Sequence, residues 1–164
     1  MNCVFDCTYC YLKGSFKNSF PVIFVNYEDF KIALDQKIKE IRVEGYQGQI
    51  TFYASNYADL LAIEHLTHFH ETFIPFFEQY EGVLLETRTK SANIEGLKRL
   101  VLSPAKANQR KVSRIGRVGE AEGATEIAFS LSPEPIAKLY ESGTASLSSK
   151  LFAIQQLLEL DYRV

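Results

Sequence analysis

Residues 3–12 read Cys-Val-Phe-Asp-Cys-Thr-Tyr-Cys-Tyr-Leu and hold all three cysteines of the chain, Cys3, Cys7 and Cys10, in the spacing C-x3-C-x2-C. An odd number of thiols in such short loops cannot form a closed disulfide framework. A zinc site takes four ligands, usually as two separated pairs, and the sequence has no second cysteine pair. Thiolates are the usual ligands of iron–sulfur clusters, and three of them on a [4Fe–4S] cube leave one iron open. The spacing favours such a cluster over a short zinc knuckle or three unrelated buried cysteines.

The size and composition are those of a single globular domain. At 164 residues, 46% of them hydrophobic, the chain is about one domain long and can build a core. A net charge of −2 gives no indication of a polyanionic partner. No apolar run approaches the ~18 residues of a membrane span, and Asp6 with the cysteines interrupts any signal-peptide core. Because clustered reduced thiols persist in reducing compartments, we predict a cytoplasmic protein.

Apolar runs and helical periodicity alternate along the chain. Strands are predicted over 49–54, 82–87 and 125–132, with a further strand beginning at 162–164. Helices are predicted over about 26–42, 62–79, 93–102, 133–140 and 147–160. Such alternation implies βαβ units and a parallel sheet covered by helices. A complete TIM barrel takes about 250 residues, so we predict an α/β fold that is a partial (βα) TIM-type barrel, forming one incomplete domain over 1–164.

The periodicity also predicts which side chains of the helices face the core. Pro75 should kink the second helix or end it early, and Ser132 followed by Pro133 should cap the fourth. The predicted inward residues are Phe30, Leu34, Ile38 and Ile41 in the first helix, Leu66, Phe69, Phe73, Phe76 and Phe77 in the second, and Leu147, Leu151, Ile154, Leu157 and Leu158 in the last.

Two further segments have a plain and a functional interpretation. Residues 103–123 carry five basic residues before any acidic one. They form either a solvated insertion loop, the interpretation we favour, or a contact to a phosphate backbone. His65, His68 and His70 form an H-x-x-H-x-H pattern, but on one helix His70 lies off the face that the other two share. Surface or core histidines are therefore favoured over a metal site.

The cysteine spacing, with the aromatic Tyr9 directly before Cys10, resembles the signature of the radical S-adenosylmethionine (SAM) superfamily. The resemblance implies that Cys3, Cys7 and Cys10 hold a [4Fe–4S] cluster whose open iron binds the amino and carboxylate groups of SAM. It further implies reductive cleavage of SAM to methionine and a 5′-deoxyadenosyl radical.

The resemblance narrows to the spore photoproduct lyase family, a group of radical SAM DNA-repair enzymes. Residues 7–12, 52–59, 63–67, 87–90, 129–132 and 141–147 are similar to segments of that family. The resemblance implies that Lys90 pairs with the SAM carboxylate and that Ser130 forms a hydrogen bond to SAM. Ser55 is a further SAM-binding candidate. All three lie at or near the C-terminal ends of predicted strands, where βα barrels place their active sites. The plain alternatives are a solvated lysine and two turn or cap serines.

The resemblance also suggests a radical relay and partners. Tyr9 and Tyr11 match two family tyrosines implicated in hydrogen-atom transfer, although aromatic packing over the cluster is an equal alternative. The implied partners are DNA with damaged pyrimidines and an external electron donor such as flavodoxin or ferredoxin.

The sequence departs from the family at two positions and in its length. Asn56 stands where the family has a hydrogen-donating cysteine, and Ala58 replaces a nearby serine. No strand precedes Cys3, and the chain stops before the family's last barrel strands and DNA-binding region, so we expect a fragment. We therefore predict a photoproduct lyase-like radical SAM enzyme. The alternatives are a radical SAM enzyme with a substrate other than DNA and a truncated, non-catalytic metal-binding relic.

Overall fold

A parallel three-stranded sheet forms the centre of the protein. The computed structural model describes residues 3–15, 17, 20–102 and 124–164, so the basic segment 103–123 lies outside the described residues. Strands β2 (Ile50–Tyr53), β3 (Val83–Thr89) and β4 (Ala124–Phe129) are arranged in the order β2-β3-β4, all parallel. Arg163 adds a parallel bridge to Glu126 beyond β4, where the next strand was predicted. The predicted α/β partial barrel is confirmed.

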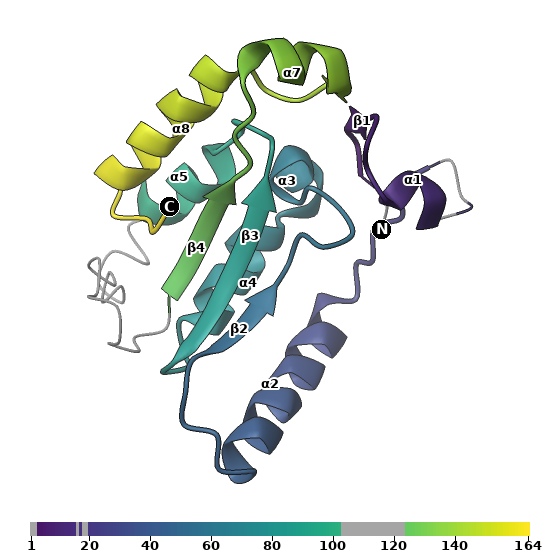
Figure 1. Ribbon diagram of the computed structural model, residues 1–164. Helices are drawn as coiled ribbons and strands as arrows, with labels where there is room; N and C mark the ends of the chain where they lie inside the picture. The colour runs from purple at the N-terminus through teal and green to yellow at the C-terminus, as the bar shows by residue number, and fades with distance from the viewer. Residues whose placement is uncertain (1–2, 16, 18–19, 103–123) are drawn as a thin grey trace.

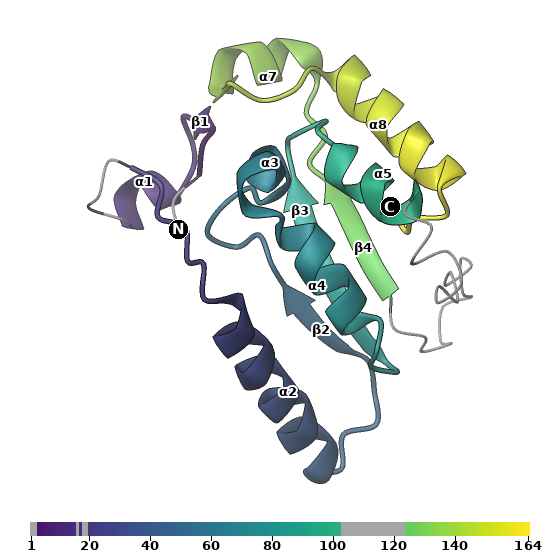
Figure 2. The same ribbon diagram turned by 180° about the vertical axis from the view of Figure 1, so that it is seen from behind.

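Helices surround the sheet unevenly. Figure 2 shows α4 (Phe69–Phe77) and α5 (Glu95–Leu102) against one face, with α8 (Leu147–Glu159) beside β4. Helix α2 (Tyr27–Val43) stands next to β2 (Figure 1). The remaining elements are short and are β1 (Asp6–Cys7), α1 (Leu12–Ser15), η1 (Leu61–Ile63), α3 (Glu64–Thr67), α7 (Glu134–Tyr140) and β5 (Glu141–Ser142). No helix among the described residues is long and apolar enough to cross a membrane.

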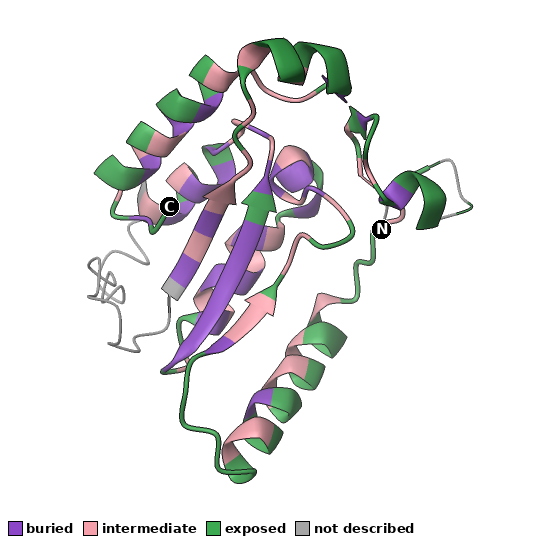
Figure 3. Cartoon of the chain, in the orientation of Figure 1, coloured by how far each residue is buried: buried purple, intermediate pink, exposed green. Residues whose placement is uncertain are grey.

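The core lies between the sheet and helices α4, α5 and α8. Strand β3 is buried at every position except Arg88 (Figure 3), as expected for the central strand of a parallel sheet, although only Val83, Leu84 and Leu85 are apolar. Aromatic rings from α4 fill the space behind the sheet. Phe69 and Phe73 stack with centroids 4.5 Å apart, and Phe77 contacts Phe52 of β2 at 5.4 Å. These contacts fix α4 against the strands whose ends carry the candidate site.

The prediction of one long helix over 62–79 is wrong, because the chain forms two helices there, α3 and α4, separated at His68. That residue adopts a left-handed conformation (φ 48°) between α3 and α4. The carboxylate of Glu64 accepts hydrogen bonds from the backbone N–H groups of His70 (3.0 Å) and Glu71 (3.2 Å), which satisfies donors at the start of α4. The break changes the phase of the helix, so Leu66 is 65% exposed instead of buried. Pro75 lies within α4, which ends two residues later.

The predicted inward face of α8 is also partly wrong. The fully buried residues are Lys150, Ala153 and Leu157, while Leu151 and Leu158 are about half exposed. Lys150 faces inward because its ammonium group donates to the carbonyl of Ser130 at 3.2 Å.

Helix α7 begins one residue later than predicted. Pro133 occupies the N-cap position, and helix residues begin at Glu134. The hydroxyl of Ser132 does not cap this helix but donates to Glu141 at 2.8 Å. The prediction that Ser132 caps this helix is therefore wrong, because its hydroxyl is bonded to Glu141.

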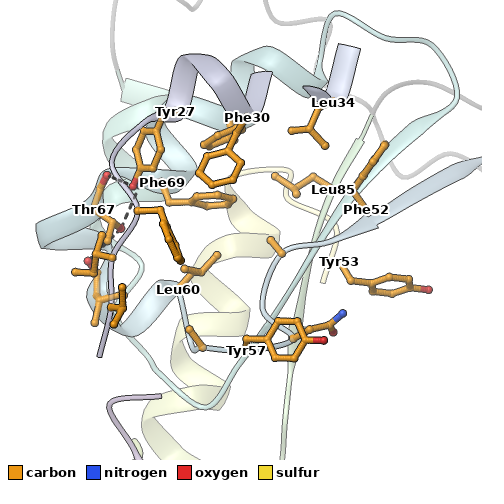
Figure 4. A pocket seen from close by; sticks show the side chains of 18 of the residues that line it. Tyr27, Phe30, Leu34, Phe52, Tyr53, Tyr57, Leu60, Thr67, Phe69 and Leu85 are labelled. Carbon is orange, nitrogen blue, oxygen red and sulfur yellow. Dashed lines mark hydrogen bonds between the residues drawn. The ribbon is translucent and has the colours of Figure 1, made fainter. Parts of the chain in front are cut away.

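Helix α2 begins after Asn26, which occupies the N-cap position without a side-chain capping hydrogen bond, and the helix packs less tightly than predicted. Only Ile38 is fully buried, Leu34 and Ile41 are partly buried, and Phe30 is 40% exposed. Phe30 and Leu34 line an apolar pocket of about 400 Å³ that α2 shares with β2 and α4 (Figure 4). The space between α2 and the outer edge of β2 explains the exposure of this helix face.

Candidate cluster and cofactor site

The polar residues predicted for the site follow the strands as expected. Lys90 comes directly after β3, Ser130 directly after β4, and Ser55 two residues after β2. Because the strands are parallel, these positions meet at one edge of the sheet. The cysteine loop lies at the same end, to which the arrowheads point (Figure 1).

A short antiparallel ladder anchors the cysteine loop. Strand β1 pairs with β5, placing Cys7 opposite Glu141. The backbone N–H of Thr8 donates to the carbonyl of Tyr140 at 2.8 Å, and the N–H of Cys10 closes a turn onto Cys7 at 3.2 Å. The loop is thus fixed to the segment between α7 and α8, far away in sequence.

The three cysteines share one short loop, and the charges of Cys3 and Cys10 act on the thiol of Cys7. Cys7 is buried, whereas Cys3 and Cys10 are half-buried, and none forms a disulfide. Burial raises the pKa of the Cys7 thiol, partly opposed by the nearby Lys90 ammonium, and the negative charges of Cys3 and Cys10 raise it further. Burial likewise raises the pKa of Cys3, against hydrogen bonds from the backbone of Phe5 and Asp59. Metal binding would displace these protons, as it does at thiolate sites generally.

The chemistry of this donor set fits an iron–sulfur cluster. Three thiols that influence one another and lie beside a cation are soft ligands suited to iron–sulfur chemistry. Within the described residues, the three cysteines included, no group of three or more His, Cys, Asp or Glu side chains is arranged to hold a metal ion, so the fit is one of donor chemistry and not of geometry.

Glu141 connects the cysteine loop to the strand ends. Its side chain is almost fully buried and accepts hydrogen bonds from the hydroxyls of Tyr9 and Ser132. The ammonium of Lys90 lies 3.2 Å from Oε1 and that of Lys150 lies 3.8 Å from Oε2. Burial raises the pKa of Glu141, but the hydrogen bonds from Tyr9, Ser132 and Lys90 outweigh it and lower the pKa to about 2. The carboxylate is therefore ionised at neutral pH.

Lys90 is an ion-paired residue of this site and not a solvated lysine. Its side chain is 21% exposed, and its ammonium lies 5.8 Å from the centre of the Tyr9 ring as well as beside Glu141. The buried carboxylate of Asp59 fixes the backbone here, accepting the N–H of Lys90 at 2.7 Å and the hydroxyl of Thr89 at 2.8 Å. Lys90 is thus held at the strand end with its charge facing the cysteine loop.

The two predicted SAM-binding serines, Ser55 and Ser130, differ in their hydrogen bonds. The hydroxyl of Ser55 is buried and has no hydrogen-bond partner among the described residues. Such orphaned polar atoms are rare in proteins, so a ligand group is a suitable partner. Ser130 is held by its backbone, since its N–H donates to Thr89 at 2.8 Å and its carbonyl accepts from Lys150.

The two tyrosines of the cysteine loop reach opposite sides of the site. Both rings are more than half exposed. The hydroxyl of Tyr9 donates to Glu141, whereas that of Tyr11 donates to the backbone carbonyl of Asn56 at 2.5 Å. The structure therefore brings together Tyr11 and the residue that departs from the family pattern.

In the part of the chain that the structure describes, none of the three histidines contacts the cysteine loop. His65 and His68 are exposed at the helix surface, and His68 pairs with Glu71. His70 is fully buried, with Nδ1 2.6 Å from Glu64 and Nε2 3.1 Å from the hydroxyl of Thr87. The buried Glu64–His70 pair joins α3, α4 and β3.

Sequence reasoning missed Glu141, Asp59 and Lys150 as site residues. Glu141 and Asp59 lay within segments recognised as similar to the family, but no local pattern marks a carboxylate as buried. Lys150 was missed because helix periodicity predicts that apolar residues, and not lysines, face the core. Their roles follow from long-range contacts, such as the ladder between β1 and β5.

The parallel sheet, with a three-cysteine loop and polar strand ends at one edge, is a partial radical SAM core. The sequence model of the spore photoproduct lyase family matches residues 1–164, and the chain belongs to this family.

Individual relatives are similar along nearly the whole chain. The spore photoproduct lyase of Bacillus subtilis (strain 168) is 28% identical over 162 residues, covering 98% of this chain and 40% of the relative. A solved spore photoproduct lyase complexed with dinucleoside spore photoproduct is 25% identical, with a TM-score of 0.74, over 99% of this chain and 42% of that one. A mutant with bound AdoMet and the same dinucleoside has 24% identity and a TM-score of 0.75, over 99% and 41%. The chain spans less than half of these relatives.

Proposed function

We propose that this chain supplies the cluster-binding and SAM-binding part of a radical SAM enzyme that acts on a pyrimidine photoproduct in DNA. The observation that carries the proposal is the position of the three-cysteine loop, which β5 and Glu141 hold beside Lys90 at the strand ends. Membership of the family supports it. So do the solved relatives, whose names include AdoMet and a dinucleoside spore photoproduct.

In this proposal each group of residues has a separate task. Cys3, Cys7 and Cys10 would hold a [4Fe–4S] cluster, and an external donor such as flavodoxin or ferredoxin would supply its electron. When bound, the cluster would supply the reductive chemistry that cleaves SAM to methionine and a 5′-deoxyadenosyl radical. Lys90 would pair with the SAM carboxylate, a charge-assisted contact. The hydroxyls of Ser55 and Ser130 would hydrogen-bond SAM, and the orphaned Ser55 hydroxyl supports its part.

The last hydrogen-transfer step would differ from that of the family. Asn56 has no weak S–H bond, so this residue cannot return a hydrogen atom to a substrate radical. The hydroxyl of Tyr11 donates to the backbone carbonyl of Asn56, and this contact supports a tyrosine relay that would end near position 56. Asn56 also favours a second candidate function, a radical SAM enzyme of the same fold acting on a substrate other than DNA.

Two assays distinguish the candidate functions. Cleavage of SAM under reducing, anaerobic conditions separates either enzyme from a non-catalytic relic. Repair of ultraviolet-irradiated DNA then separates the photoproduct enzyme from one with another substrate. SAM cleavage with no repaired pyrimidine would favour the second candidate.

Lys90→Ala is expected to weaken SAM binding roughly tenfold or more, because it removes a charge-assisted contact. The iron content should not change, since Lys90 is not a cluster ligand in this account. Equilibrium binding of SAM to the anaerobically reconstituted protein measures the effect. Lys98→Ala is the matched control, because Lys98 pairs with Glu95 on the surface of α5. Equal SAM affinity in the Lys90 variant would remove the assignment.

Asn56→Cys is expected to increase severalfold the fraction of spore photoproduct dinucleoside that is converted to intact thymines. The new thiol would stand on the residue whose backbone carbonyl accepts from Tyr11, and it would provide the S–H bond that Asn56 lacks. Chromatography of the reaction products measures the change. Asn56→Ser is the matched control, because it is similar in size to cysteine without a weak S–H bond. A product profile unaffected by the cysteine would contradict the repair function.

A further inference from the structure

Two ammonium groups share one buried carboxylate behind the cysteine loop. Glu141 is 3% exposed, with Lys90 at 3.2 Å from one carboxylate oxygen and Lys150 at 3.8 Å from the other. The three side chains together carry one surplus positive charge. Oε2 of Glu141, which faces Lys150, has no hydrogen-bond partner among the described residues. The surplus positive charge, and not the unsatisfied oxygen, means that one of the two ammonium groups can pair with a further anion.

The two lysines differ in their freedom to meet such an anion. The side chain of Lys150 is 1% exposed, and its ammonium is also held by the carbonyl of Ser130 at 3.2 Å. The side chain of Lys90 is 21% exposed and its charge acts on Cys7. Of the two lysines, only Lys90 can therefore turn toward a ligand bound at the cysteine loop. Lys150 remains beside Glu141 and Ser130.

The neutral partners of Glu141 cannot replace a cation. Tyr9 and Ser132 donate hydrogen bonds to Oε1 through hydroxyl groups, which carry no charge. If Lys90 moved to a ligand and no other ammonium were present, the buried carboxylate would lose its counter-ion. Leaving a buried charge uncompensated is strongly unfavourable, so Lys90 would remain with Glu141.

We propose that Lys150 is a positioning residue that neutralises Glu141 and thereby releases the ammonium of Lys90 for the carboxylate of SAM. Lys150 acts through Glu141 and Lys90 and does not touch the ligand. Lys150, whose ammonium lies 3.8 Å from Oε2 of Glu141, would remain as the counter-ion of this carboxylate when Lys90 leaves Oε1. This inference rests on the proposed function, in which Lys90 receives the SAM carboxylate.

The test compares SAM with 5′-deoxyadenosine, which has no carboxylate, in equilibrium binding to the anaerobically reconstituted protein. Lys150→Met, which keeps the length of the side chain without its charge, should weaken SAM binding roughly tenfold or more. Its affinity for 5′-deoxyadenosine and its iron content should not change. Lys150→Arg, which keeps the charge, should bind SAM nearly as well as the unsubstituted protein.

A double variant separates this role from a merely structural one. Lys150→Met combined with Glu141→Gln removes both buried charges, so Lys90 is free again and most of the SAM affinity should return. Undiminished SAM binding in Lys150→Met, an equal loss for both ligands, or no recovery in the double variant would each overturn the inference.

Two further results are decisive if the proposed function or the fold of a variant fails. An unsubstituted protein that holds iron but binds no SAM would overturn the proposed function, and this inference with it. If Lys150→Met does not fold, SAM binding by the single variant Glu141→Gln tests the inference. Freed from its carboxylate, Lys90 should then bind SAM at least as tightly as before, and a tenfold loss would contradict the inference.

Discussion

Replacing Cys7 by alanine is expected to reduce the iron bound after anaerobic reconstitution from about four atoms per chain to near zero. Cys7 is the central and most buried of the three cysteines, and β5 fixes it opposite Glu141. The sequence holds no fourth cysteine that could take its place. Iron and acid-labile sulfide per chain, together with the brown colour, measure the loss.

Thr8→Ala is the matched control for the cysteine variant. Thr8 is the exposed neighbour of Cys7, and its backbone bond to Tyr140 does not depend on its side chain. This variant should keep its iron. Retained iron and colour in the Cys7 variant would contradict the cluster assignment, whereas loss of iron in both variants would indicate a general disruption of the loop.

Replacing Glu64 by alanine is expected to lower the free energy of unfolding by about 3 kcal/mol or more, because it removes the acceptor of several buried hydrogen bonds and each buried group left unsatisfied costs about 1–3 kcal/mol. Glu64 and His70 are 1% and 0% exposed and lie 2.6 Å apart. The same carboxylate satisfies the backbone at the start of α4, including the N–H of Glu71. Removing it leaves Nδ1 of His70 and these backbone donors without a partner, while Nε2 of His70 keeps its contact with Thr87. The midpoint of urea-induced unfolding measures the change.

Glu95→Ala is the surface counterpart of this substitution. Glu95 lies in the first turn of α5, and its side chain is 66% exposed and paired with Lys98. Exposed pairs of this kind are worth at most about 1 kcal/mol. A similar, small shift of the unfolding midpoint in the Glu64 and Glu95 variants would show that the buried pair does not stabilise the connection between α3 and α4.

The parts of this protein that follow local patterns could be predicted from the sequence. Apolar runs gave the three parallel strands, and therefore the strand-end positions of Ser55, Lys90 and Ser130. The cysteine motif is local as well, so the three-cysteine loop could be located in the sequence, and its cluster chemistry stays a prediction. Strand alternation with helices was sufficient to predict a partial barrel, because βα connections leave few other arrangements.

The parts that failed depend on contacts between distant segments. Periodicity could not detect the break at His68, which the side chain of Glu64 stabilises by capping the following helix. It also placed Leu151 inward in preference to Lys150, because a buried lysine is unusual unless it is paired. The partner of Lys150, Glu141, is positioned by the ladder that carries the cysteine loop. Neither feature has a signal within its own helix.

The central claim is that this chain holds a [4Fe–4S] cluster on Cys3, Cys7 and Cys10. The most direct test is the amount of iron and acid-labile sulfide bound to the unsubstituted chain after anaerobic reconstitution. The account predicts about four of each per chain. Zinc in their place, or no bound metal, would contradict it.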